Sequence, residues 1–338
     1  MKTWRRDFLK MASTFGLFSW LTVSSRSGGN TQANEQADQA AADEIPFHQL
    51  HAEPLVRSSY PVHRRFDNGM AQQSVVITAR GLERVDWEVQ PEKHCWILLL
   101  PEMAFVDRER WDYQTGMDWH QEPGGWAYQN CPLRNLKGRW RDVGGQNQLA
   151  PGTEEEVPVL GRMAATVRTD ELGVHYALTL TNATNKPWND VFFWICLNHY
   201  QSRITGYRPH FRVGTSWLPA QEMPPGRSQV HTYYPAPGMV AAYRSSPDKR
   251  FGRADTELSF PGVVCWNRTA EGPLLVCHCS PNAMAVGSNQ NWPCTDLQLW
   301  FGTVAAGEQK SKTGHVLVAR CDLKTFAGRA DEILERLE

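Results

Sequence analysis

The sequence predicts an all-β fold, a large β-sandwich or supersandwich of mainly antiparallel strands with a short C-terminal helix. Apolar and polar residues alternate in most segments after residue 74, which is typical of half-buried strands. Gly (26) and Pro (21) are frequent and apolar runs are short, which favours strands joined by turns. Outside the N-terminal region, helical spacing of apolar residues is sustained only over 324–337.

The stretch 174–200 is the centre of the predicted sandwich. Residues 174–181 alternate strictly, so they form a strand with one buried face. Residues 182–187 are rich in Asn, Thr, Lys and Pro and predict a turn. Residues 191–197 are apolar on both faces, which indicates a strand covered on both sides. This strand ends in Asn198 and His199, and a rigid strand that ends in polar groups is one way to build a site.

The remaining elements follow in order along the chain. Residues 101–141 predict a long irregular loop rich in Trp, Tyr and Arg that lies over an open sheet face. Residues 282–292 predict a second loop, because they are rich in Gly, Asn and Ser. Further strands are expected at 74–79, 85–90, 94–100, 159–169, 260–266, 274–279, 296–301 and 315–320.

The amino-acid composition narrows the range of ligands that the protein is expected to bind. The formal net charge is −1, which gives no basic footprint for nucleic acid, so none is expected as a partner. Trp (14) outnumbers Phe (13) and Tyr (9). Indole rings are good platforms for the apolar faces of sugars, although sandwiches also use Trp for packing.

The N-terminus predicts export. Residues 3–10, Thr-Trp-Arg-Arg-Asp-Phe-Leu-Lys, resemble the twin-arginine motif, and 11–23 fit a signal h-region too short for a membrane span. We therefore expect a twin-arginine signal peptide at 1–30, a flexible leader at 31–44 and a single β-sandwich domain at 45–338. The resemblance implies passage through the twin-arginine export machinery to a periplasmic or secreted location, with no transmembrane segment in the mature chain.

Eight Cys in an exported chain suggest disulfides, but several lie inside apolar strand patterns and look like small core residues. We expect one or two disulfides at most, with Cys196 and Cys277 free. Cys279 with Cys294 is the preferred pair if any forms.

Two segments carry a family resemblance: LTLTNATNKPWNDVFFWICLN and FGTVAAGEQKSKTGHVLV. They resemble a hairpin and a turn of the galactose-mutarotase-like supersandwich proteins, a class with sugar epimerases and polysaccharide lyase domains. In its enzymes, His residues and a carboxylate on the concave sheet face do acid–base work on a sugar. His199, His278 and Asp296 occupy comparable strand ends here.

Three functional hypotheses stay open at this stage. The first is a carbohydrate-active enzyme in which His199, His278 and Asp296 perform acid–base chemistry. It requires the two His side chains within roughly 8 Å of each other, both partly open to solvent, below a Trp of the 101–141 loop. The expected substrate-binding residues are Trp119, His120, Trp126, Asn198, Arg203, Tyr207 and Arg208.

The second hypothesis is a non-catalytic carbohydrate-binding or cell-surface module, which needs aromatic and polar groups but no titrating pair. The third, weaker hypothesis is a divalent metal held by His199, His278 and Asp296. Apart from this possible metal site, the sequence predicts no cofactor and no further metal ligands.

Overall fold

The computed structural model describes residues 45–57, 72–80, 82, 95–107, 109–111, 117–135, 140–143, 146–149, 157–199, 208–223, 229–233, 253–269, 272–289 and 293–337. These residues belong to one compact unit, 45–338. The signal peptide and leader at 1–44 and the strand expected at 85–90 lie outside the described residues. Within the described residues, no helix has the length and apolar character needed to cross a membrane.

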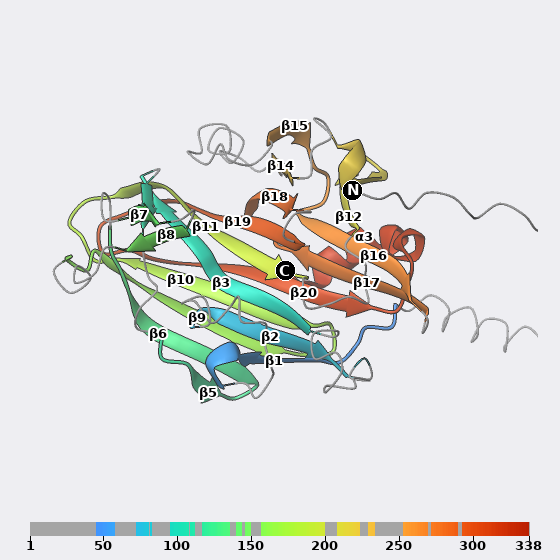
Figure 1. Ribbon diagram of the computed structural model, residues 1–338, viewed down its shortest axis with the longest axis horizontal. Helices are drawn as coiled ribbons and strands as arrows, with labels where there is room; N and C mark the ends of the chain where they lie inside the picture. Colours follow the sequence, from blue (N-terminus) through green and yellow to red (C-terminus); the bar gives the residue numbers. More distant parts are fainter. Residues whose placement is uncertain are drawn as a thin grey trace, which may run out of the picture. The chain divides into compact units, whose positions relative to one another are not determined.

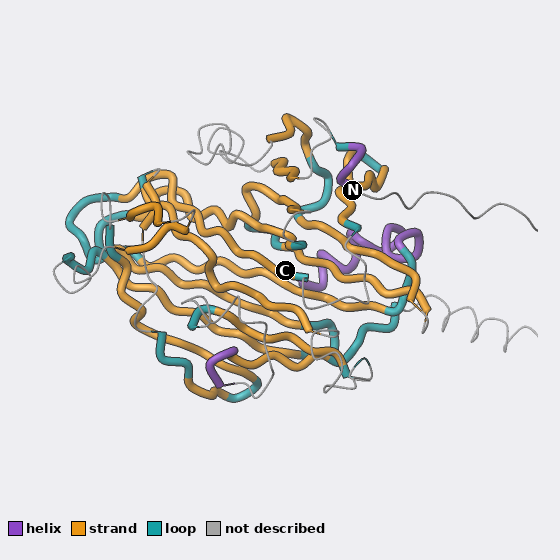
Figure 2. The backbone as a smooth tube through the Cα atoms, in the orientation of Figure 1, coloured by secondary structure: helices purple, strands orange, loops and turns teal. Residues whose placement is uncertain are grey.

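The predicted sandwich is confirmed: two nine-stranded sheets and a C-terminal helix make up most of the fold (Figures 1 and 2). The first, here the β11 sheet, has the order β1-β2-β3-β11-β19-β18-β14-β15, with β4 paired to β3. Its strands are β1 (Leu50–Pro54), β2 (Ser74–Ala79), β3 (Cys95–Val106), β4 (Glu109–Trp111), β11 (Trp188–Asn198), β14 (Gln229–Tyr233), β15 (Arg253–Glu257), β18 (Ala283–Asn289) and β19 (Cys294–Val304).

The second, here the β10 sheet, has the order β13-β12-β16-β17-β20-β10-β9-β6-β5. Its strands are β5 (His120–Glu122), β6 (Gly125–Leu133), β9 (Gly161–Thr169), β10 (Val174–Asn182), β12 (Pro209–Val213), β13 (Ser216–Pro219), β16 (Gly262–Thr269), β17 (Gly272–Cys279) and β20 (Gln309–Ala319). Strands β7 (Trp140–Val143) and β8 (Gln146–Leu149) pair separately. Short 3-10 turns lie at Leu55–Arg57 and Ala220–Glu222.

The main core lies between the two sheets. Inward residues of the β11 sheet, such as Ile195 and Leu297, share one buried cluster with inward residues of the β10 sheet, such as Leu178 and Val276. The strict alternation of β10 and the doubly buried β11 arise from this arrangement, because β11 is central in its sheet and is covered on both faces.

The outer face of the β10 sheet packs against the helix α3 (Leu323–Leu337), as the apolar spacing predicted. Phe326, Ala330 and Ile333 of the helix join Leu275 and Leu317 of the sheet in a second buried cluster. The outer face of the β11 sheet carries a third cluster, which includes Phe105, Phe192 and Trp194.

Two loop predictions are wrong. Much of 101–141 is strand, because β3 runs on through Pro101 and β4, β5 and β6 follow. Pro101 lies where the β3–β11 register shifts between Trp194 and Cys196, and such a bulge accommodates a residue without an N–H. The segment 282–292 contains β18, whose small residues are buried between β14 and β19.

The preferred disulfide pair, Cys279 with Cys294, is not formed, whereas the expectation that Cys196 and Cys277 are free is confirmed. Cys279 and Cys294 lie on β17 and β19, in different sheets, and all eight Cys are free thiols. Each Cys is buried, so these residues pack as small apolar side chains.

Candidate functional site

The two histidines of the enzyme hypothesis meet at a single hydroxyl group. Nε2 of His199 lies 3.2 Å from Oγ1 of Thr295, and Nδ1 of His278 lies 3.3 Å from the same oxygen. The hydroxyl of Tyr176 lies 3.0 Å from Nε2 of His278. The structure therefore brings the two rings within the roughly 8 Å that a shared ligand requires.

These rings lie in the core between the sheets and are closed to solvent. His199 is 2% exposed and His278 is 1% exposed. Burial, followed by the charge of His278, lowers the pKa of His199 to about 3, and burial lowers the pKa of His278 to about 4. Both rings are therefore neutral near pH 7. The solvent access that the enzyme hypothesis requires is not present here.

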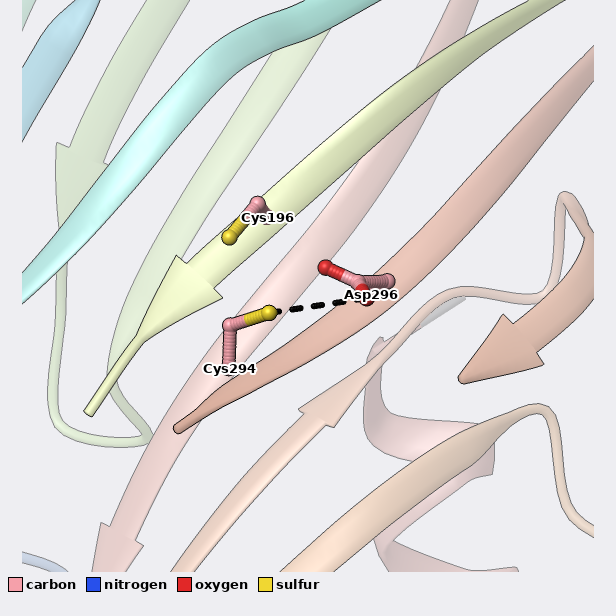
Figure 3. A group of neighbouring side chains, drawn as sticks. All are labelled: Cys196, Cys294 and Asp296. Atoms are coloured by element: carbon pink, nitrogen blue, oxygen red, sulfur yellow. Dashed lines mark hydrogen bonds between the residues drawn. The ribbon is translucent and has the colours of Figure 1, made fainter. Parts of the chain in front are cut away.

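Asp296, the third predicted group, points away from the two histidines. It follows Thr295 on β19, and successive residues of a strand face opposite sides of the sheet. Thr295 faces the core, so Asp296 faces outward from the β11 sheet, where it lies beside Cys196 and Cys294 (Figure 3). The described residues therefore do not place His199, His278 and Asp296 around one pocket.

The predicted aromatic platforms lie at the β5–β6 end of the β10 sheet. Trp119 is 1% exposed, donates its indole N–H to the carbonyl of Gln72 over 2.7 Å and packs edge-on against Tyr128. Trp126 is half-buried and packs against the main core. Both rings thus contribute to packing. Trp119 also lines a cavity of about 460 Å³ with Arg57 and Asp118.

The other predicted binding residues are dispersed. His120 pairs with Glu122 on β5 over 3.4 Å. Asn198 is buried at the end of β11, and Arg208 is exposed just before β12, at the opposite edge of the β10 sheet from β5. Arg203 and Tyr207 lie outside the described residues.

A polar groove of about 310 Å³ crosses β6, β9 and β10 on the outer face of the β10 sheet. Its floor includes Ala127 and Ala164, whose small side chains leave the hollow. The other outward-facing lining residues carry hydroxyl, amide or guanidinium groups: Gln129, Asn130, Arg162, Thr166, Thr179, Thr181 and Gln309. None of the lining residues among those described is a carboxylate.

The register of the strands builds this groove. Thr181 pairs with Arg162 on one side and Gln309 on the other, and Thr166 pairs with Ala127. The β6–β9 register shifts between Tyr128 and Cys131, so Gln129 and Asn130 form a bulge at the rim. Sequence reasoning assigned Thr179 and Thr181 to a polar strand face but placed Gln129 and Asn130 in a loop, so it missed the groove.

A second polar cluster lies on the same outer face, nearer α3. Nε2 of His175 lies 2.7 Å from Oδ1 of Asp170, and Nδ1 of His175 lies 2.8 Å from Nδ1 of His315. His315 is 4% exposed, and burial, followed by the charge of His175, lowers its pKa to about 4. The cluster joins the loop before β10 to β20.

Comparison with known proteins shows distant structural similarity only. No family model matches the chain, and no curated protein matches it. Two solved structures that are similar are galactose mutarotase-like proteins, one from Lactobacillus casei ATCC 334 and one from Clostridium acetobutylicum. The first has 9% identity and a TM-score of 0.35, and the match covers 74% of this chain and 94% of that one. The second has 7% identity and a TM-score of 0.31, and the match covers 74% and 87%.

A third similar structure is a sulfoquinovosidase of family GH31 from E. rectale in complex with an aza-sugar inhibitor. It has 10% identity and a TM-score of 0.23, and the match covers 67% of this chain and 31% of that one. The chain is thus a β-sandwich protein with distant structural similarity to galactose mutarotase-like proteins. A likeness this distant concerns the course of the backbone and not the site.

Proposed function

We propose that this protein is an exported carbohydrate-binding protein, and that the polar groove on β6, β9 and β10 holds the sugar. The observation that carries the proposal is the lining of the groove. Hydroxyl and amide groups both donate and accept hydrogen bonds, as sugar hydroxyls do. Arg162 adds a donor that suits a carboxylate or a hydroxyl group.

The strands of the groove support binding without a large ordering cost. Thr166, Thr179 and Thr181 lie on paired strands in the middle of a sheet, so their backbone positions are fixed before a ligand arrives. Thr side chains also have few rotamers to lose on binding. A neutral polyhydroxylated ligand matches such a preorganised and mostly uncharged surface.

Binding is favoured over catalysis because the titrating pair of the enzyme hypothesis is sealed in the core. A general acid or base has to reach its substrate and titrate near the working pH. His199 and His278 meet neither condition, because they are buried and their pKa values are lowered to about 3 and about 4. The carbohydrate-binding module, the second hypothesis from the sequence, is therefore the one we adopt.

Export to the periplasm or the cell exterior is part of the same proposal. It rests on the twin-arginine motif at 3–10, with Arg5 and Arg6 as its central pair. An exported protein meets polysaccharides of the cell envelope and of the surroundings. Location and ligand class are thus compatible.

The test is a screen of the full chain against immobilised neutral and uronate-containing glycans, followed by calorimetry on a ligand that binds. Thr166→Val and Thr181→Val remove a hydroxyl from the groove at nearly constant volume. Each lost hydrogen bond contributes about 0.5–1.5 kcal/mol, so each variant should bind roughly two- to tenfold more weakly.

Ser216→Ala is the matched control, because Ser216 is exposed on β13 at the far edge of the same sheet. It should bind as the unmodified chain does. Absence of binding to every glycan, or unchanged affinity in both Thr variants, would refute the groove as a sugar site.

A further inference from the structure

The outer face of the β11 sheet carries three soft or anionic ligand groups in mutual contact. Cys196 projects from β11, and Cys294 and Asp296 project from the adjacent strand β19 (Figure 3). In the antiparallel register of β11 and β19, Cys196 lies directly opposite Asp296. Cys294 is two residues before Asp296 on β19, so it is a diagonal neighbour of Cys196. All three are buried, with exposed fractions of 4%, 6% and 3%. This cluster is on a different sheet from the proposed sugar groove.

The spacing of the ligand atoms matches a tetrahedral metal site. One ligand atom from each residue can be chosen so that all lie within 4.8 Å of one another. Sγ of Cys294 lies 3.6 Å from Oδ2 of Asp296. Around Zn²⁺, with Zn–S of about 2.3 Å and Zn–O of about 2.1 Å, two tetrahedral ligands of this kind are about 3.6 Å apart.

Burial and nearby acidic groups act on the two thiols of the cluster. The hydrogen bond shared with Cys294, burial and the charges of Asp296 and Glu102 hold the pKa of Cys196 well above its usual range. The hydrogen bond with Cys196 lowers the pKa of Cys294, but burial, Asp296 and Glu102 outweigh it and raise that pKa to about 12. A bound dication stabilises the thiolate form of a Cys ligand, so the geometry of the three groups, and not these pKa shifts, is the basis of the proposal.

We propose that Cys196, Cys294 and Asp296 bind a thiophilic divalent cation of the Zn²⁺ type. Two thiolates and one carboxylate supply the soft and anionic ligands that Zn²⁺ takes in proteins. On binding, each thiol loses its proton to solvent, so two protons leave for each cation bound at neutral pH.

This site differs from the metal site expected from the sequence. That prediction combined His199 and His278 with Asp296, but the histidines lie on the other side of the β11 sheet and contact Thr295. The sequence shows Cys294 and Asp296 two residues apart, whereas Cys196 joins them only through the pairing of β11 with β19.

The test is titration of the full-length, reduced, chelator-treated chain with Co²⁺ and then Zn²⁺. Tetrahedral thiolate-bound Co²⁺ absorbs in the near ultraviolet and visible range, so the bands should saturate at one equivalent and disappear when Zn²⁺ is added. Cys196→Ala, Cys294→Ala and Asp296→Asn should each weaken Co²⁺ binding at least tenfold.

Cys95→Ala is the matched control, because Cys95 is equally buried on β3 of the same sheet and lies outside the cluster. It should give the bands of the unmodified chain. The spectrum of the unmodified chain alone decides the matter if a variant does not fold. Absence of Co²⁺–thiolate bands would overturn the proposal, as would a mass 2 Da lower that maps to a Cys196–Cys294 disulfide in the isolated protein.

Discussion

Nδ1 of His278, on the β10 sheet, lies 3.3 Å from the hydroxyl oxygen of Thr295, on the β11 sheet. The contact crosses the interior of the sandwich, beside the apolar cluster shared by the two sheets. Because Tyr176 contacts the second nitrogen of the ring, a shift of one sheet against the other breaks a buried hydrogen bond. This polar bridge thus helps to fix how the two sheets align.

Because the bridge contains buried histidines, we expect the free energy of unfolding to decrease as the solution becomes acidic. Unfolded histidines titrate near pH 6.5, whereas the pKa values of His278 and His199 in the folded chain are about 4 and about 3. Between these values the unfolded state binds more protons, so the free energy of unfolding decreases as pH falls below 6.5. Each group contributes about 1.4 kcal/mol per pH unit.

Urea unfolding at pH 7, 6 and 5 measures this slope. His278→Gln should reduce it by about the contribution of a single histidine. An identical slope in His278→Gln and the unmodified chain contradicts the prediction.

Gly314 is predicted to be intolerant of any side chain. A Cβ at this position would overlap the ring and hydroxyl of Tyr176, its partner on β10. Tyr176 cannot retreat, because it is buried and bound to His278. Gly314→Ala should therefore destabilise the chain by about 1–3 kcal/mol in chemical unfolding.

The loss of stability caused by Gly314→Ala should be smaller when the ring of Tyr176 is removed. In a Tyr176→Leu background, Gly314→Ala should cost less, and the difference is the coupling between the two sites. Gly328→Ala, in α3 with nothing within 4 Å of the added Cβ, should stabilise by about 0.5–1 kcal/mol. Additive effects at Gly314 and Tyr176 would show that they do not compete for the same space.

The sequence predicted elements where local pattern and final burial agree. β2 is Ser74–Ala79 in the structure, as its apolar run predicted. Helical spacing predicted five inward residues in α3. Four of them are buried, Phe326, Ala330, Ile333 and Leu337, and Leu334 is half-buried. α3 packs one apolar face against the sheet, and the continuous apolar run of β2 matches its burial on both faces, so each pattern is complete within a few residues.

The elements and sites that the sequence failed to predict share a physical cause. β18 reads as a loop because Gly, Ser and Asn residues lie at its end and just beyond it, yet β14 and β19 provide hydrogen bonds on both sides. The β6 bulge depends on which residue of β9 faces Tyr128, and no local pattern encodes that pairing. The same limit hid the groove and the Cys196–Cys294–Asp296 cluster, because each joins residues from strands far apart in sequence.

The packing of α3 predicts a large cost for removing Phe326. Its ring contacts Phe260 edge-on at 6.2 Å between centroids and Trp217 at 5.9 Å. Phe326→Ala leaves a cavity in that cluster and should reduce the free energy of unfolding by about 3–5 kcal/mol. Leu334→Ala, at a half-buried position of the same helix, should cost clearly less. Equal costs in urea unfolding would mean that α3 is not docked through Phe326.

The proposed export signal predicts a simple genetic result. Replacing both Arg5 and Arg6 by Lys keeps the positive charge but removes the paired guanidinium groups of the motif. The precursor should then remain in the cytoplasm, whereas Lys2→Arg, outside the motif, should leave export unchanged. Cell fractionation with an antibody to the folded domain measures both. Normal export of the double variant would contradict the signal.

Two substitutions of Asn130 distinguish the effect of the groove's shape from the effect of its hydrogen-bonding groups. This residue has a positive φ of 57°, a conformation that Gly and Asn adopt far more readily than other residues. Asn130→Gly keeps the bulge and removes the amide, whereas Asn130→Ala removes the amide and strains the bulge by about 1 kcal/mol. If the amide contacts the sugar, both variants bind the glycan more weakly.

Only Asn130→Ala should also lose stability, because Gly accepts the backbone conformation without strain. Thermal unfolding and calorimetry on the same two proteins therefore distinguish a direct contact from an effect on the bulge. If Asn130→Gly binds as the unmodified chain does while Asn130→Ala binds weakly, the bulge matters only as a scaffold. In that case Gln129 and Arg162 are the rim groups that remain to hold the ligand, because both line the groove beside Asn130.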